Sequence, residues 1–195
     1  MALTVTAKVT NIRSLAEARF CAGMGVEILS FQLNDNGLPL EEAAGITSWL
    51  AGVKIAVDAI GLPEENLKQQ IEFLQPSYIT VSESQLISWQ NQGDPGFILQ
   101  LSDVDLLSIQ NKINIFKDSA EFFEISYQST WIENGQEDLF IEISNNSRIM
   151  VAFHSLDELD DLFRTGKIFR SISLNKSNFK EDDFRKAIEM FEEMD

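Results

Sequence analysis

The side chains that could do chemistry in this chain stand at the ends of short apolar, β-branched segments. Asp58, Glu124 and His154 bring the titratable groups, and Lys8 lies inside the first segment. The remaining polar candidates are amides, a hydroxyl and a second lysine: Thr10, Asn11, Gln32, Asn175 and Lys176. Carboxyl and imidazole groups can transfer protons, whereas amides and hydroxyls mainly hold polar groups by hydrogen bonds. The set predicts a site for a small polar ligand that is sparse in catalytic groups.

Neither a metal nor a cofactor is expected from these residue types. His154 is the one histidine and Cys21 the one cysteine, and Cys21 sits in the apolar stretch ARFCAG as a small core residue would. A transition-metal site would need carboxylates such as Asp58 or Glu124 to complete it. Glycine-rich phosphate loops and metalloprotease or hydrolase signatures are absent. His154 could be a general base or a hydrogen-bonded residue of the rim, and Asp58 a base or a helix cap.

Lys8 shares side-chain parity with Thr10, because alternate residues of a strand point to the same face. Both should therefore point inward if either does. A buried ammonium group is costly unless it is paired. Its partner should be either a structural carboxylate or an anionic ligand.

The elements that position these residues form a repeating pattern. Eight strand candidates alternate with helical segments at intervals of about 20 to 27 residues, which leaves room for one strand, one short helix and two tight connections. The strand candidates cover residues 3–9, 26–33, 53–58, 77–82, 97–101, 121–126, 148–153 and 170–174. The pattern predicts an α/β fold in which residues 1–195 form a single small (β/α)8 barrel of the TIM type. An open sheet of five or six strands is the alternative.

Helix-start signals follow most of the strands. Four pairs have the spacing of a capping box: Ser14 with Glu17, Ser82 with Gln85, Ser155 with Glu158, and Asn178 with Glu181. The sixth unit is the least distinct, with a weak helix around 137–143.

The charge balance excludes several partners. Fifteen Lys and Arg residues against 31 Asp and Glu give a formal net charge of −16, which repels nucleic acid and anionic membranes. No apolar run approaches the roughly 20 residues of a membrane span, and the N-terminal stretch lacks the pattern of a secretory signal. We therefore expect a cytoplasmic protein with no nucleic-acid or membrane partner. The sequence does not indicate an oligomeric state.

The stretch AKVTNIRSLAEARFCAGMGVEILSF resembles the first unit of phosphoribosylanthranilate isomerase. That unit reads K-[IV]-C-G-[IL]-T, then N-x-x-D-A, then A-G-A-D-x-[LI]-G-F. The residues that fall on family-like positions are Lys8, Val9, Ile12, Leu15, Ala18, Gly25, Leu29 and Phe31. The resemblance implies a small (β/α)8 barrel. In the family this barrel performs an Amadori rearrangement in tryptophan biosynthesis, with a cysteine as general base and an aspartate as general acid.

Both of those catalytic positions are changed in this chain. The cysteine of the family motif falls on Thr10, whose hydroxyl is far too weak an acid to replace a thiolate. The aspartate of the sixth strand falls on Ile125, or on Glu124 after a slip of one residue.

The family's phosphate-binding parts are changed as well. The Gly-Gly pair after the seventh strand reads Phe153-His154, so we expect a side chain where backbone amides should be open. The S-S-G segment reads 173–175, SLN, and the arginine loop S-P-R is replaced by NDNG at 34–37. These changes favour a barrel that has lost the isomerase activity and acts as a non-catalytic binding or interaction protein. The alternatives are an enzyme of changed chemistry acting on a small polar metabolite, and a retained isomerase.

Overall fold

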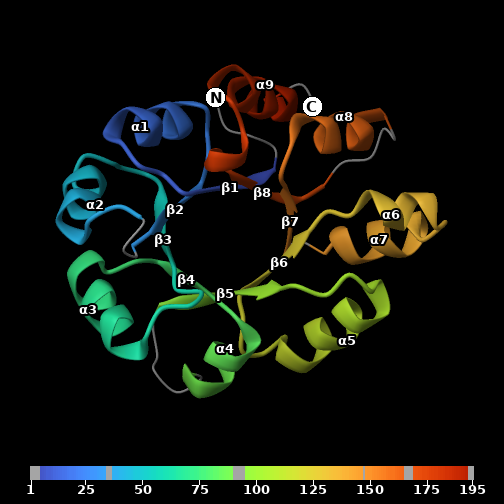
Figure 1. Ribbon diagram of the computed structural model, residues 1–195, viewed down its shortest axis with the longest axis horizontal. Coiled ribbons are helices and arrows are strands. Elements are labelled where there is room, and N and C mark those ends of the chain that lie inside the picture. The colour runs from blue at the N-terminus through green and yellow to red at the C-terminus, as the bar shows by residue number, and fades with distance from the viewer. Residues whose placement is uncertain (1–4, 34–36, 90–94, 147, 165–168, 193–195) are drawn as a thin grey trace.

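In the computed structural model of this chain, eight parallel strands close into a barrel surrounded by helices (Figure 1). The structure describes residues 5–33, 37–89, 95–146, 148–164 and 169–192, so most of the NDNG loop lies outside the described residues. The strands are β1 (Thr6–Thr10), β2 (Ile28–Gln32), β3 (Lys54–Asp58), β4 (Tyr78–Val81), β5 (Gly96–Leu101), β6 (Phe122–Ser126), β7 (Ile149–Phe153) and β8 (Ser171–Asn175). Because β8 pairs with β1 over five residues, from Thr6 opposite Ser171 to Thr10 opposite Asn175, the open-sheet alternative is wrong and the predicted (β/α)8 barrel is confirmed.

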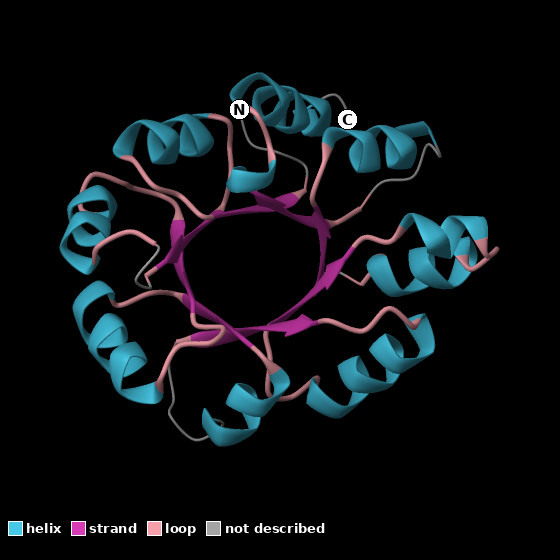
Figure 2. Cartoon of the chain, viewed as in Figure 1, coloured by secondary structure: helices cyan, strands magenta, loops and turns pink. Residues whose placement is uncertain are grey.

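The helices form the outer ring that Figure 2 shows around the strands. Their bounds are α1 (Leu15–Gly23), α2 (Leu40–Thr47), α3 (Glu64–Leu74), α4 (Glu83–Trp89), α5 (Leu106–Phe116), α6 (Ser129–Glu133), α7 (Glu137–Ser144), α8 (Leu156–Arg164) and α9 (Glu181–Glu192), with a 3₁₀ turn, η1 (Lys176–Asn178), after β8. Among the described residues, no helix combines the length and the apolar character that a membrane crossing requires.

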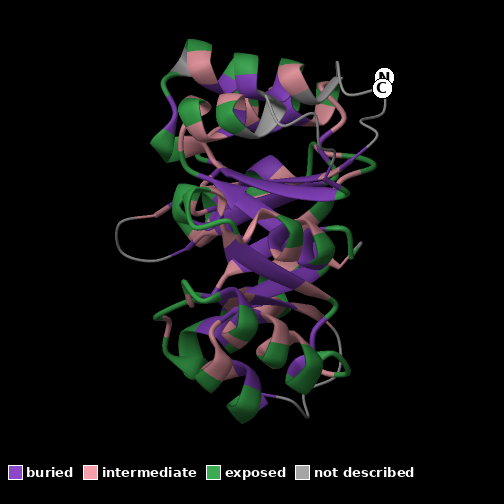
Figure 3. Cartoon of the chain, turned by 90° about the vertical axis from the view of Figure 1, so that its right-hand side faces the viewer, coloured by how far each residue is buried: buried purple, intermediate pink, exposed green. Residues whose placement is uncertain are grey.

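Strand parity divides the core into two layers. Outward residues such as Val9, Phe31 and Val57 join the large apolar core under the helices. A separate small cluster fills the lower interior of the barrel, toward the strands' N-terminal ends, and consists of Ile28, Ala56, Tyr78, Ile98 and Met150 with Phe122 packed against it. In Figure 3 the buried positions accordingly concentrate in the strands and on the inner faces of the helices. The lower interior is thus filled mainly by apolar side chains. Apart from Thr6, Lys54 and Ser171 at the N-terminal ends of their strands, the polar residues of inward parity lie toward the other end.

Two serine caps form as their spacing predicts, and the Ser82–Gln85 pair forms the reciprocal bond of a capping box. The Ser14 and Ser155 hydroxyls accept hydrogen bonds from the backbone N–H groups of Glu17 and Glu158, and the Gln85 side chain accepts one from the N–H of Ser82. The fourth prediction is wrong, because α9 begins only at Glu181 and Asn178 belongs to η1.

The sixth unit contains two short helices, of which α7 matches the weak helix predicted at 137–143. They are held by an aromatic cluster in which Phe140 packs against Tyr127, Trp131 and Phe169. Phe153 belongs to the same cluster and is fully buried under the helices. The expectation that its ring would stand at the strand ends is therefore wrong, because Phe153 has outward parity on β7.

Candidate functional site

Above the apolar cluster, the interior of the barrel is lined almost wholly by polar side chains. A lower, buried group consists of Lys8, Ser30, Thr80, Glu124 and Ser173. An upper, half-buried group sits at or near the C-terminal ends of the strands and consists of Thr10, Gln32, Asp58, Gln100, Ser126 and Asn175. We call the upper group the mouth. In TIM barrels this end of the strands carries the functional groups.

A buried ion pair crosses the lower group. Lys8 Nζ lies 2.6 Å from Glu124 Oε2 and donates a second hydrogen bond of 3.0 Å to Thr80 Oγ1. Gln100 Nε2 donates to the other Glu124 oxygen at 3.4 Å. Lys8 is 1% exposed and Glu124 5%. Since these residues come from β1, β4, β5 and β6, the bonds span the interior, and the partner of Lys8 is a structural carboxylate.

Asp58 stands at the end of β3, close enough to this pair to interact with both charges. Its Oδ1 accepts a 3.2 Å hydrogen bond from the N–H of Ile60, so the side chain caps the turn that follows the strand. Burial raises the pKa of Asp58 above its ordinary value, and the negative charge of Glu124 adds to the effect. The Ile60 amide and the Lys8 ammonium oppose it. The mouth therefore holds a carboxyl group, that of Asp58, whose pKa is raised by its surroundings.

Three mouth side chains have unused hydrogen-bonding capacity. Thr10, Gln32 and Ser126 share inward parity with Lys8, Ser30 and Glu124 on their own strands. Their side chains make no hydrogen bond to any described residue. Beneath Gln32, the Ser30 hydroxyl is buried and also without a partner among the described residues. Polar groups in such positions are normally paired, with water or a ligand where protein offers nothing.

The other predicted residues are engaged around the rim. His154 is exposed, and its Nδ1 lies 3.1 Å from the Asn178 amide nitrogen, so the structure places it as a hydrogen-bonded rim residue. Asn175 Oδ1 accepts from the Ser177 N–H and caps η1. Their bonds hold loops in place.

Lys176 and Asn11 also bond away from the barrel axis. Lys176 forms an ion pair with Glu17 of α1 at 3.1 Å. Asn11 has a left-handed backbone (φ 61°), and its Oδ1 accepts from the Arg13 Nε–H. The structure therefore separates these residues from the Lys8–Glu124 pair, although all were predicted as parts of one pocket.

The one-residue ambiguity on β6 is settled by parity. Ile125 is fully buried in the outer core, whereas Glu124 points into the barrel. Ile125 is therefore excluded from the site. Thr80 and Ser30 were not predicted, although their parity with Ser82 and Gln32 was a signal that could have found them. Within the described part of the chain, no three His, Cys, Asp or Glu side chains gather as a metal site would need.

The barrel closely follows solved isomerase structures. TrpF from Jonesia denitrificans superposes with a TM-score of 0.74 at 11% identity, covering 97% of each chain. N-(5'-phosphoribosyl)anthranilate isomerase from Pyrococcus furiosus gives 0.68 at 14% identity, covering 97% of this chain and 98% of that one. The fold is that of the phosphoribosylanthranilate isomerases. The sequences have nevertheless diverged far. At identities of 11% and 14%, the likeness shows a shared fold and does not show a shared activity.

Other comparisons limit what the likeness implies. Citrate synthase SbnG shares the fold at a TM-score of 0.61 and 9% identity, covering 96% of this chain and 91% of that one. No family model matches the sequence, and no curated protein does. The barrel shape is therefore common to proteins of different activity, and the function has to be argued from the side chains.

Removing one half of the buried pair should destabilise the barrel. We expect Glu124→Leu to cost about 3–5 kcal/mol of unfolding free energy, because it leaves the Lys8 ammonium buried without a counter-charge. The double variant Lys8→Met/Glu124→Leu should recover most of that loss, since both charges are then gone. Urea unfolding of Glu124→Leu, of Lys8→Met, of the double variant and of the wild type measures the coupling between the two residues. Additive single effects would contradict a direct pair.

Asp58 should make stability depend on pH. Its raised pKa means that the native state holds the proton more tightly than the unfolded chain does. The stabilising contribution is therefore complete below the ordinary value of 3.8 and is lost as the pH rises through the native value. Asp58→Asn keeps the acceptor for Ile60 and removes the titration, so the variant should gain stability relative to wild type as the pH rises. Urea unfolding at several pH values tests this, with the exposed Asp118→Asn as control. A difference that shrinks with rising pH would refute it.

Proposed function

We propose that this chain is a binding barrel that takes a small, uncharged, polyhydroxylated ligand at its mouth and does not isomerise phosphoribosylanthranilate. The observation that carries the proposal is that some polar side chains inside the barrel have no partner among the described residues, while the buried Lys8 and Glu124 are paired. The side chains of Thr10, Gln32 and Ser126 make no hydrogen bond to a described residue. Below them, Lys8 and Glu124 form an ion pair with each other. The free groups can hold a ligand, and the bound ones are not available for proton transfer.

Loss of the isomerase reaction follows from the acid and base positions. A threonine hydroxyl at position 10 does not exchange protons near neutral pH as a thiolate would. Glu124, the inward carboxylate of β6, is buried and accepts from both Lys8 and Gln100. Removing a general acid or base costs about 10²–10⁴ in rate, and here both positions are altered.

The charges of the interior favour an uncharged ligand over a phosphorylated one. Lys8 and Glu124 cancel, and ionised Asp58 leaves one negative charge at the mouth. Such a field repels phosphate, whereas the amide and hydroxyl groups match the donors and acceptors of a sugar or polyol. A hydroxyl of that ligand could donate to the Asp58 carboxylate, which burial has left poorly solvated.

The second candidate is an enzyme of changed chemistry acting on the same class of ligand. It is favoured by Asp58, because a half-buried carboxyl of raised pKa beside a lysine is the environment in which general acids and bases are found. Turnover of a bound polyol that Asp58→Asn abolishes would distinguish this candidate from simple binding.

A ligand screen followed by thermal unfolding tests the proposal. A ligand that binds the native state raises the melting temperature, and we expect this from one or more unphosphorylated sugars or polyols and not from their phosphate esters. The rise should disappear in Gln32→Ala and Thr10→Val, because each removes a side-chain group that would bind the ligand. It should persist in Gln69→Ala, since Gln69 lies exposed on α3. A response only to phosphate esters, or one that survives both mouth substitutions, would overturn it.

A further inference from the structure

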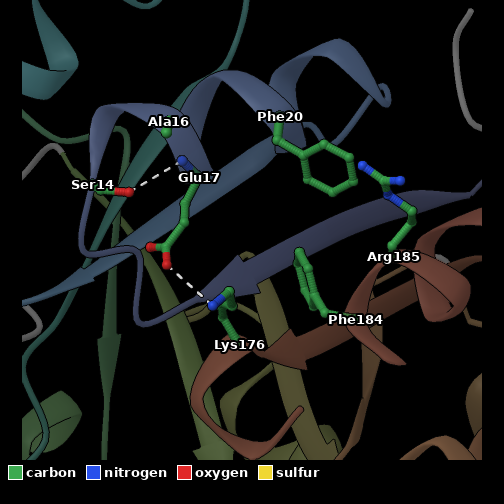
Figure 4. Close-up of a pocket in the computed structure, with 7 residues that line it drawn as sticks. All are labelled: Ser14, Ala16, Glu17, Phe20, Lys176, Phe184 and Arg185. Atoms are coloured by element: carbon green, nitrogen blue, oxygen red, sulfur yellow. Dashed lines mark hydrogen bonds and ion pairs between the residues drawn. The ribbon is translucent and has the colours of Figure 1, made fainter. Parts of the chain in front are cut away.

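A second concave site lies on the outside of the barrel, between α1 and α9. It is a cavity of about 340 Å³ into which Phe20 and Glu17 project from α1 and Phe184 and Arg185 from α9 (Figure 4). Lys176 of η1 lies at its base. The volume is at the lower end of the range for small-molecule sites. None of these residues lines the mouth, so this groove is separate from the proposed polyol site.

The apolar part of the groove comes from two rings. The Phe20 and Phe184 centroids are 6.3 Å apart with the rings tilted by 55°. Phe184 is fixed from behind by Phe179, also at 6.3 Å. Phe184 is buried, while Phe20 is only half-buried and faces the opening. Together they provide a firm aromatic wall with accessible ring surface.

The polar part of the groove carries a net positive charge. Lys176 Nζ forms an ion pair with Glu17 Oε1 at 3.1 Å, while Glu17 Oε2 accepts from the Arg13 backbone N–H at 2.9 Å. Both oxygens of that carboxylate are thus engaged, and Lys176 has ammonium donors left for a ligand. The Lys176 side chain is 23% exposed, which leaves those donors accessible.

Arg185 adds a second cation. Its guanidinium carbon lies 5.7 Å from the Phe20 centroid, within cation–π range, and it forms no ion pair with any described residue. The cation–π contact holds the guanidinium group beside the Phe20 ring and leaves its N–H groups free for a carboxylate acceptor. Two cations against one carboxylate make a local positive site on a chain of net charge −16.

We propose that this groove binds a small organic anion with a flat apolar body, such as an aromatic carboxylate. The carboxylate accepts hydrogen bonds from Lys176 and Arg185, and the ring packs on Phe20 and Phe184. Neither part is sufficient alone, since an exposed cation pair holds inorganic anions weakly and an apolar wall does not select charge.

Benzoate is the probe, with two matched comparisons. In ¹H–¹⁵N spectra of the full chain, benzoate should shift the amide signals around 14–20 and 184–185 with a dissociation constant in the millimolar range. Benzamide has the same shape without the charge, and inorganic phosphate has charge without the ring. Both should bind at least tenfold more weakly. Equal shifts from either of them, or benzoate shifts confined to the strand ends, would overturn the proposal.

Substitution of Arg185 provides the second test. Arg185→Gln keeps the length and an amide donor while removing the charge, and we expect it to weaken benzoate binding about tenfold. Lys186→Gln removes one positive charge from an exposed neighbouring position on α9 and should leave binding unchanged. Both changes are at exposed sites, so unchanged thermal unfolding confirms that the variants are folded. Equal loss in the two variants would show that only net charge matters and would overturn the site.

Discussion

The Lys8–Glu124 pair is the interaction on which the arrangement of this barrel depends. Two opposite charges less than a tenth exposed are stable together only because each neutralises the other and because Thr80 and Gln100 supply further hydrogen bonds. The pair joins β1 to β6 across the interior of the barrel. It rests on the apolar cluster around Met150 and Tyr78, so polar and hydrocarbon layers divide the interior. The mouth residues above the pair are half-buried, and among them Thr10, Gln32 and Ser126 make no side-chain hydrogen bond to a described residue.

The fold could be predicted from the sequence because its signals are local. Each strand is a short apolar run, and the serines at 14 and 155 stand where a helix start needs a side-chain acceptor. Strand parity predicted that Lys8 and Thr10 share a face, and the buried Lys8–Glu124 pair shows that this face is the interior. The order of the strands then follows from right-handed crossovers between successive units.

The site was less predictable because it depends on contacts between distant strands. Glu124 is 116 residues from Lys8, and only closure of the barrel brings them together. A slip of one residue reverses every side chain of a strand, which is why Glu124 and Ile125 could not be told apart from the sequence. The position of Lys176 depends on the 3₁₀ turn after β8, which places its ammonium group beside Glu17 and the outer groove.

On the proposed account, the Lys8–Glu124 ion pair leaves the barrel interior unable to perform the isomerase reaction. The most direct test is to measure whether the purified protein converts N-(5'-phosphoribosyl)anthranilate. Product formation should be measured for the wild type and for Thr10→Cys, which restores the thiol at the family's base position. The account predicts that neither converts the compound faster than buffer alone, because the carboxylate on β6 stays bound to Lys8. Conversion by the wild type that disappears in Glu124→Gln would contradict it.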